Sequence, residues 1–192
     1  MESSQVKIIL RDPISEDDFR PIAYFQGWLW WDKVPESEEH PYESIYTTLD
    51  KKTSLHFVDD SLLDVRYLLI KGSNVEATAA KARSVLPTWE DAEVLRTARG
   101  ADEPEERQRA ILQSAVLAAE NKDPVFLEIF RQARSHPDPA VRRAAMTAIS
   151  YLGWPELREI VAEYASDPDP EVRQDAATLL EAYELQDRGL LE

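Results

Sequence analysis

The chain contains no cysteine and only five glycines among its 192 residues. The absence of cysteine excludes a disulfide scaffold, a Cys-ligated zinc site and a thiol nucleophile. The few glycines form neither a GxGxxG nor a GxxxxGK[ST] phosphate loop, and no GxSxG serine motif occurs. We therefore expect a protein that is not an enzyme and carries no cofactor.

Basic residues are also scarce, because 22 Lys and Arg stand against 37 Asp and Glu, for a formal net charge of −15. This balance argues against non-specific nucleic-acid binding and against an anionic membrane surface as partner. No run approaches the roughly 20 apolar residues of a membrane-spanning helix, and the first residues do not resemble a signal peptide. The hydrophobic content of 43% is enough for a folded core. We expect a cytoplasmic protein, and its oligomeric state stays open.

The first third of the chain has the period-2 pattern of β-strands. The polar break 50–52 has the length of a hairpin turn, and the break at 59–61 predicts a second turn. Successive strands joined in this way favour a small antiparallel meander, so we predict an α+β fold for this part. The predicted strands are Gln5–Leu10, Tyr42–Leu49, Thr53–Val58 and Asp64–Ile70.

A short helix is predicted between the first strand and the hairpin. Ser15 and Asp18 have the spacing of a capping box, and Pro21 is expected to limit the length of the helix.

An aromatic run follows at Tyr24–Trp31. Its rings either form the core of the sheet domain or anchor a protein interface. Since adjacent side chains diverge, at least one of the three tryptophans is expected to be exposed. The candidate partner-binding residues of this run are Trp28, Trp30 and Trp31.

The second half contains an internal repeat. The segment Asp138–Arg142 (DPAVR) recurs 31 residues later as Asp169–Arg173 (DPEVR), and 103–107 is a degenerate upstream copy. Each copy opens an amphipathic helix, because Asp accepts hydrogen bonds from the free N–H groups of the first turn and Pro fits the first helical position. A second amphipathic helix follows in each unit. Neither helix can bury its face alone, so the units must stack.

Residues 102–184 resemble a HEAT-repeat array, specifically the short bacterial kind similar to phycobilisome-lyase HEAT-like repeats. The motif that carries the resemblance is Asp-Pro-x-Val-Arg-x-x-Ala, at Asp138–Ala145 and Asp169–Ala176. The resemblance implies an all-α solenoid with hydrogen bonds along the stack. The residues implied in this structural role are Asp138, Pro139, Arg142, Asp169, Pro170 and Arg173.

These patterns divide the chain into an α+β sheet domain, residues 1–87, which resembles no family known to us, and HEAT-like helical repeats, residues 88–192. We expect the helix at 74–86 to pack on the sheet and the helix at 88–99 to bridge to the repeats, although 73–99 could belong to either part. At the C-terminal end, Leu190 and Leu191 are expected to fold back as a cap, with contact to a partner as the alternative.

The three histidines show no metal-ligand spacing. His56, which lies beside Asp59 and Asp60, could bind a metal or act as a base. The favoured interpretation is a strand-face histidine followed by a polar turn, because no second histidine is near in sequence. We predict no metal site.

HEAT arrays generally line their concave side with the second helices of the repeats. A row of acidic side chains there would suit a partner with a basic surface. The chain is therefore predicted to be an adaptor that binds a protein; the alternatives are an immunity or inhibitor protein that neutralises a basic toxin or nuclease, and a subunit of a lyase-type enzyme. The outward-facing candidates are Glu128, Arg131, Glu156, Arg158, Glu159 and Glu163.

Overall fold

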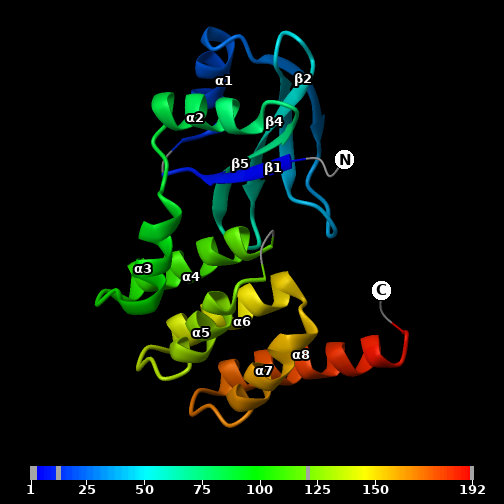
Figure 1. Ribbon diagram of the computed structural model, residues 1–192. Helices are drawn as coiled ribbons and strands as arrows, with labels where there is room; N and C mark the ends of the chain where they lie inside the picture. Colours follow the sequence, from blue (N-terminus) through cyan, green and yellow to red (C-terminus); the bar gives the residue numbers. More distant parts are fainter. Residues whose placement is uncertain (1–3, 12–13, 120–121, 191–192) are drawn as a thin grey trace. The chain divides into compact units, whose positions relative to one another are not determined.

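A computed structural model describes residues 4–11, 14–119 and 122–190 of the chain (Figure 1). The chain forms two compact units, residues 1–90 and 91–192. The first contains a sheet with two helices, and the second contains helices.

The first unit is built on a five-stranded antiparallel sheet with the strand order β1-β5-β4-β3-β2. Strands β2 to β5 follow one another as a meander, and β1 pairs with the last of them. The antiparallel sheet predicted from the sequence is therefore confirmed. Its strands are β1 (Ser4–Ile9), β2 (Leu29–Val34), β3 (Tyr42–Thr47), β4 (Thr53–Asp60) and β5 (Val65–Gly72).

Two helices, α1 (Glu16–Phe25) and α2 (Val75–Val85), contribute to the hydrophobic core on one face of this sheet. Phe19 of α1 is fully buried against Tyr46 and Phe57 of the sheet, with ring centroids 5.1 and 5.3 Å away. The predicted helix over 74–86 thus packs on the sheet. The core of this unit also contains Ile8, Leu10, Ile14, Ala23, Trp28, Leu55, Leu68, Ile70, Val75, Ala79, Ala82 and Leu86.

Helix α1 begins with the predicted capping box, in which Ser15 and Asp18 exchange hydrogen bonds. Pro21 lies inside α1 and does not stop it at once, because the helix continues to Phe25. Pro21 is exposed, and Phe19 and Ala23, two residues to either side of it, are in the core. Tertiary packing here outweighs the local cost of a missing N–H donor.

A carboxylate in the first turn also ties α1 to β3. Glu16 accepts hydrogen bonds from the Tyr42 hydroxyl at 2.8 Å and from the buried Ser44 hydroxyl at 3.0 Å. Arg20 donates a third, also at 3.0 Å. Burial alone would raise the pKa of Glu16, but these three hydrogen bonds outweigh it and hold the pKa below its usual value.

Two features of this unit differ from what the sequence predicted. Strand β2 was not predicted at all, since most of its side chains are exposed on both faces and give no alternation. Asp59 and Asp60 do not form a turn, because they are the last residues of β4. Asp60 is only 2% exposed, and its Oδ1 accepts a hydrogen bond from the Leu63 N–H in the turn that follows.

The second unit consists of helices in the described residues. Helices α4, α6 and α8 begin at the three copies of the repeated motif, and α5 and α7 are the second helices of the two complete pairs. The first helices of successive repeats pack together, α4 with α6 and α6 with α8. The second helices, α5 and α7, are also in contact. The elements are α3 (Asp91–Gly100), α4 (Pro104–Ala118), α5 (Pro124–Ala133), α6 (Pro139–Leu152), the 3-10 turn η1 (Pro155–Leu157), α7 (Arg158–Tyr164) and α8 (Pro170–Asp187).

The expected fold-back cap at the C-terminal end is not formed by Leu190, which is 67% exposed. Helix α8 extends to Asp187, and Gly189 follows it at a φ of 67°. Leu191 lies outside the described residues.

Candidate functional site

The repeated Asp-Pro pairs cap helices in the second unit. Asp138 accepts a hydrogen bond from the Ala140 N–H at 2.8 Å. Asp169 accepts from the Glu171 and Val172 N–H groups at 2.9 and 3.1 Å. Pro139 and Pro170 occupy the first turn of each helix, where no N–H donor is needed. These two acids therefore have the structural role of helix N-caps.

The hydrogen bonds between successive repeats differ from those the resemblance implied. Arg142 forms a bidentate ion pair with Asp167, with hydrogen bonds of 2.8 and 2.9 Å. It does not pair with Asp138 or Asp169, contrary to what the resemblance implied. It also donates to the carbonyls of His136 and Pro137, so one guanidinium joins two consecutive repeat loops.

Arg142 and Asp167 are 5% and 6% exposed, which makes this a buried pair. Burial alone would raise the pKa of Asp167, but the hydrogen bonds from Arg142 and from the Asp169 N–H outweigh it and lower the pKa. Asp167 was not predicted from the sequence, although it lies two residues before the capping Asp169.

Arg173, the equivalent of Arg142 in the last repeat, donates only to the backbone carbonyls of Asp167 and Pro168 among the interactions found in the described residues. No further complete repeat follows α8 in the described chain to supply a carboxylate.

The first repeat departs from this scheme. His136 stands where the next repeat has Asp167, and its Nδ1 accepts the Asp138 N–H as Asp167 accepts the Asp169 N–H. Arg107 is the motif equivalent of Arg142. Its Nε is buried and has no hydrogen-bond partner among the described residues. By the repeat alignment, His136 stands at the position whose aspartate in the next repeat accepts from Arg142.

The predicted acidic row on the second helices is interleaved with basic groups. Glu163 on α7 lies 3.8 Å from Arg131 of α5 and 4.0 Å from Arg134, the residue that follows α5. Glu156 in η1 pairs with Lys122, and Arg158 on α7 pairs with Asp187 of α8. Four of the six predicted residues therefore take part in exposed ion pairs between neighbouring elements.

The other two candidates, Glu128 on α5 and Glu159 on α7, are exposed. They occupy equivalent positions in the two repeats, because they are 31 residues apart, which is the offset between the two copies of the repeat motif. Glu128 accepts a hydrogen bond from Gln132 on its own helix at 2.6 Å. These two carboxylates are the best placed of the six to meet a partner.

The aromatic run separates into a buried and an exposed part. Trp28 is 3% exposed and belongs to the hydrophobic core, so it is not an exposed partner anchor as predicted. Trp30 and Trp31 on β2 are 55% and 59% exposed. The Lys51 ammonium lies 5.2 Å from the centre of the Trp31 ring. Further exposed apolar side chains of this segment are Tyr24, Phe25 and Leu29.

A Ser–His–Glu arrangement lies on the sheet. The His56 Nδ1 is 2.6 Å from a Glu43 oxygen, and its Nε2 is 3.1 Å from the Ser54 hydroxyl. The hydrogen bond to His56 lowers the pKa of Glu43 in spite of partial burial.

The distances of this arrangement match those of a nucleophile, a base and an orienting acid. However, Ser54 and His56 lie on β4, a central strand whose two edges are paired with β3 and β5. Its backbone N–H groups are engaged in these ladders and are not free to stabilise an oxyanion. We therefore interpret the arrangement as a polar network on the sheet.

Neither a cluster of metal-ligating side chains nor a membrane-spanning helix occurs in the described residues. No group of three or more His, Asp or Glu side chains there could hold a metal ion. Among the same residues, no helix has both the length and the apolar character needed to cross a membrane.

Residues 126–188 match the family model of HEAT repeats. This match runs from α5 to the end of α8 and contains both complete copies of the motif read from the sequence. The first copy, at α4, and the sheet unit lie outside the match. HEAT repeats are generally protein-interaction modules. No curated protein and no solved structure matches the chain.

Proposed function

We propose that this chain is a non-enzymatic protein-interaction module. The observation that carries the proposal is the HEAT-repeat match over residues 126–188, because stacked repeats present extended surfaces on which partners bind. In this proposal α3–α8 form a short α-solenoid related to the phycobilisome-lyase HEAT-like repeats, and the protein acts as an adaptor in the cytoplasm.

The proposed repeat surface is the side formed by the second helices α5 and α7. Its exposed carboxylates, Glu128 and Glu159, recur at equivalent positions and would meet basic groups of a partner. The net charge of −15 supports a partner with a basic surface, because long-range attraction speeds encounter. Arg131, Arg158 and the ion-paired Glu156 and Glu163 would border the contact.

The proposed second surface is the pair of exposed tryptophans on β2, Trp30 and Trp31. Large exposed aromatic side chains are enriched among residues that dominate binding energy. Trp30 and Trp31 are 55% and 59% exposed, so a partner can reach both residues.

Charge reversal tests the repeat surface. A double variant, Glu128→Lys with Glu159→Lys, should weaken capture of the partner and make it less sensitive to salt. Glu38→Lys with Glu39→Lys changes the net charge equally in an exposed loop of the sheet unit and is the matched control. Equal loss of binding in both variants would show that only net charge matters, and unchanged binding in the first variant would overturn the proposed surface.

The small size and the acidic charge also favour one narrower function, an immunity or inhibitor protein that neutralises a basic toxin or nuclease. Tight, stoichiometric inhibition of such an enzyme by the purified protein would select this function over a general adaptor. A chromophore that co-purifies with the chain would instead favour a subunit of a lyase-type enzyme.

A further inference from the structure

One face of helix α8 is exposed although the equivalent face of α6 is buried. Helix α6 packs on both α4 and α8, whereas α8 packs mainly on α6 and α7 among the described elements (Figure 1). The α6 residues of this face, each at most 5% exposed, are Arg142, Met146 and Ile149. Their equivalents 31 residues later, which are exposed or half-buried, are Arg173, Ala177 and Leu180. The spacing of i, i+4 and i+7 places these three on one face of α8.

The guanidinium of Arg173 is held in the same way as that of Arg142. The Nη1 of Arg173 donates to the carbonyls of Asp167 and Pro168 at 2.7 and 3.0 Å. The Nη1 of Arg142 donates to the two equivalent carbonyls, 31 residues earlier. Each arginine is thus fixed to the loop that precedes its own helix.

The two arginines differ in what their other nitrogens bind. The Nε and Nη2 of Arg142 donate to the two carboxylate oxygens of Asp167, in the loop of the next repeat. The interactions found for Arg173 in the described residues use its Nη1 and leave its Nε and Nη2 without a partner. These two nitrogens form the fork that binds a carboxylate bidentately. The occupied fork of Arg142 therefore shows which chemical group the fork of Arg173 accepts.

The segment that covers the equivalent face of α6 shows what kind of partner fits. It consists of the loop that carries Asp167 and of α8, which begins three residues later at Pro170. The loop supplies the carboxylate, and the helix supplies a buried apolar stripe. The residues of this stripe are Val172, Ala176 and Tyr183.

We propose that the exposed face of α8 docks an amphipathic helix of a partner protein that has an aspartate or glutamate in the loop before its first turn. The carboxylate pairs with the Nε and Nη2 of Arg173, and apolar side chains of the helix cover Ala177 and Leu180. A loop with a neutral or basic residue at this point leaves the fork unpaired, so recognition depends on the acid. The face belongs to a first helix of the repeats and is therefore separate from the proposed surface on the second helices α5 and α7.

A peptide of this chain provides the probe. Residues 165–187 with blocked ends contain the acidic loop and the helix that cover α6. The peptide is titrated into the isotope-labelled full chain in about 0.3 M sodium chloride, because salt screens the repulsion between two acidic molecules. Amide NMR should show shifts centred on residues 173–184. Shifts centred on residues 141–149 would show that the peptide replaces α8 on α6, and they would overturn the proposal.

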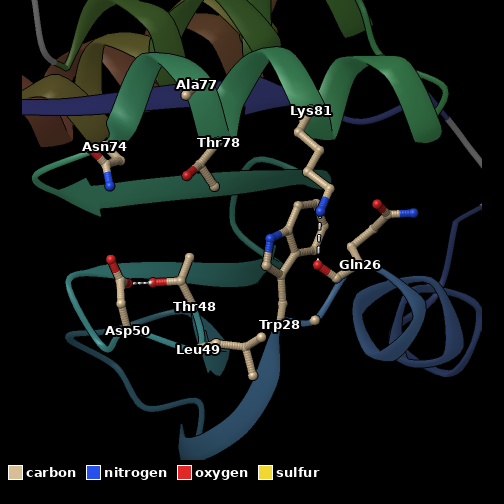
Figure 2. Close-up of a pocket in the computed structure, with 10 residues that line it drawn as sticks. Gln26, Trp28, Thr48, Leu49, Asp50, Asn74, Ala77, Thr78 and Lys81 are labelled. Atoms are coloured by element: carbon tan, nitrogen blue, oxygen red, sulfur yellow. Dashed lines mark hydrogen bonds between the residues drawn. The ribbon is translucent and has the colours of Figure 1, made fainter.

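Single changes on each side identify the contact. Arg173→Met in the chain, or Asp167→Asn in the peptide alone, should weaken binding by about tenfold, and the two together should weaken it no further. The peptide control is Glu181→Gln, which removes one charge outside the loop. The chain control is Lys81→Met, which removes one positive charge from the sheet unit, where the ammonium donates to the Gln26 carbonyl at 2.9 Å (Figure 2). Both controls should bind like the parent molecules.

Three further results would overturn the proposal. The first is a peptide that shifts no amide of α8, and the second is an Arg173→Met chain that is folded by its NMR spectrum and binds the peptide as tightly as the parent chain. The third is a dimer of the full chain alone, seen by sedimentation, that Arg173→Met dissociates, because it would assign this face to a second copy. The surface at Glu128 and Glu159 has its own charge-reversal test, so the two proposals can fail separately.

Discussion

Gly72, at the end of β5, is the glycine in this chain with the strictest backbone requirement. Its φ of 130° lies in a region that L side chains rarely adopt. An ideal Cβ there would lie 2.1 Å from the Lys52 carbonyl oxygen and 2.8 Å from the Thr53 Cα, both of which are backbone atoms of the adjacent strand region. The backbone therefore has to move before any side chain fits.

We predict that Gly72→Ala destabilises the sheet unit by more than about 3 kcal/mol, since strain and clash add together. The measurement is the free energy of unfolding from denaturant titration. Gly100→Ala is the control: a Cβ there meets nothing within 4 Å, and Gly100 lies in α3, so this change should be neutral or slightly stabilising. Similar effects of both changes would contradict the clash.

Asp167 makes the stability of the repeats depend on pH. Because the pKa of its folded-state carboxyl is lowered, the stabilisation is fully present above the unfolded pKa of about 3.9 and is lost as the pH falls through the folded pKa. Asp167→Asn removes the charge at constant shape and leaves the buried Arg142 without its counter-charge.

We predict that Asp167→Asn costs about 3–5 kcal/mol at neutral pH. The difference between the variant and the parent chain should shrink as the pH falls below about 4. Urea unfolding at a series of pH values measures both quantities, and a difference that stays constant down to the lowest pH would contradict the assigned role of the ion pair.

The helices of the repeat half were easier to predict than their contacts. Caps such as Asp138 and Asp169 depend on groups two or three residues away, so the Asp-Pro motif was enough to place them. Arg142 and Asp167 are 25 residues apart in the sequence, and their ion pair depends on how two loops pack against each other. No local sequence pattern encodes that packing. The same limit applies to the acidic row, since the pairing of Glu163 with Arg131 and Arg134 arises only when α5 and α7 are side by side.

In the sheet half, the strands with a buried face were predicted, and the exposed edge strand β2 was not. Strands β3 to β5 alternate in burial or are buried on both faces, whereas β2 is exposed along almost its whole length. Trp28 shows why the aromatic run could not be divided from sequence: it is buried only because α1 ends at Phe25 and turns the chain back over the core.

The exception in the first repeat can be repaired. His136→Asp would place a carboxylate where the next repeat has Asp167, keep the acceptor for the Asp138 N–H and give the orphan Nε of Arg107 a partner. We predict a gain of about 1 kcal/mol in the free energy of unfolding. Arg107→Met in the His136→Asp background should abolish the gain, and a gain that persists in this double variant would contradict the proposed pairing.

At the scale of the whole molecule, the division into residues 1–90 and 91–192 makes a prediction about folding. Each unit has its own buried core, so we propose that the two are separate domains, close to the boundary after residue 87 predicted from the sequence. Separately expressed fragments 1–90 and 91–192 should each unfold cooperatively on heating, as followed by circular dichroism. A helical fragment without a cooperative transition would show that the repeats need the sheet unit to fold.

The register shift in β2 has a consequence for the behaviour of the protein at high concentration. Trp30 and Asp32 pair with adjacent residues of β3, so Trp31 is an extra residue that forms a bulge in the edge strand. An open edge with two half-exposed tryptophans would otherwise be a template for intermolecular strand pairing and aggregation. The bulge twists this edge and interrupts its regular row of donors and acceptors, and the charges of Asp32 and Lys33 oppose the approach of a second edge. The chain can therefore display aromatic rings on a sheet edge while the edge itself resists growth into fibrils.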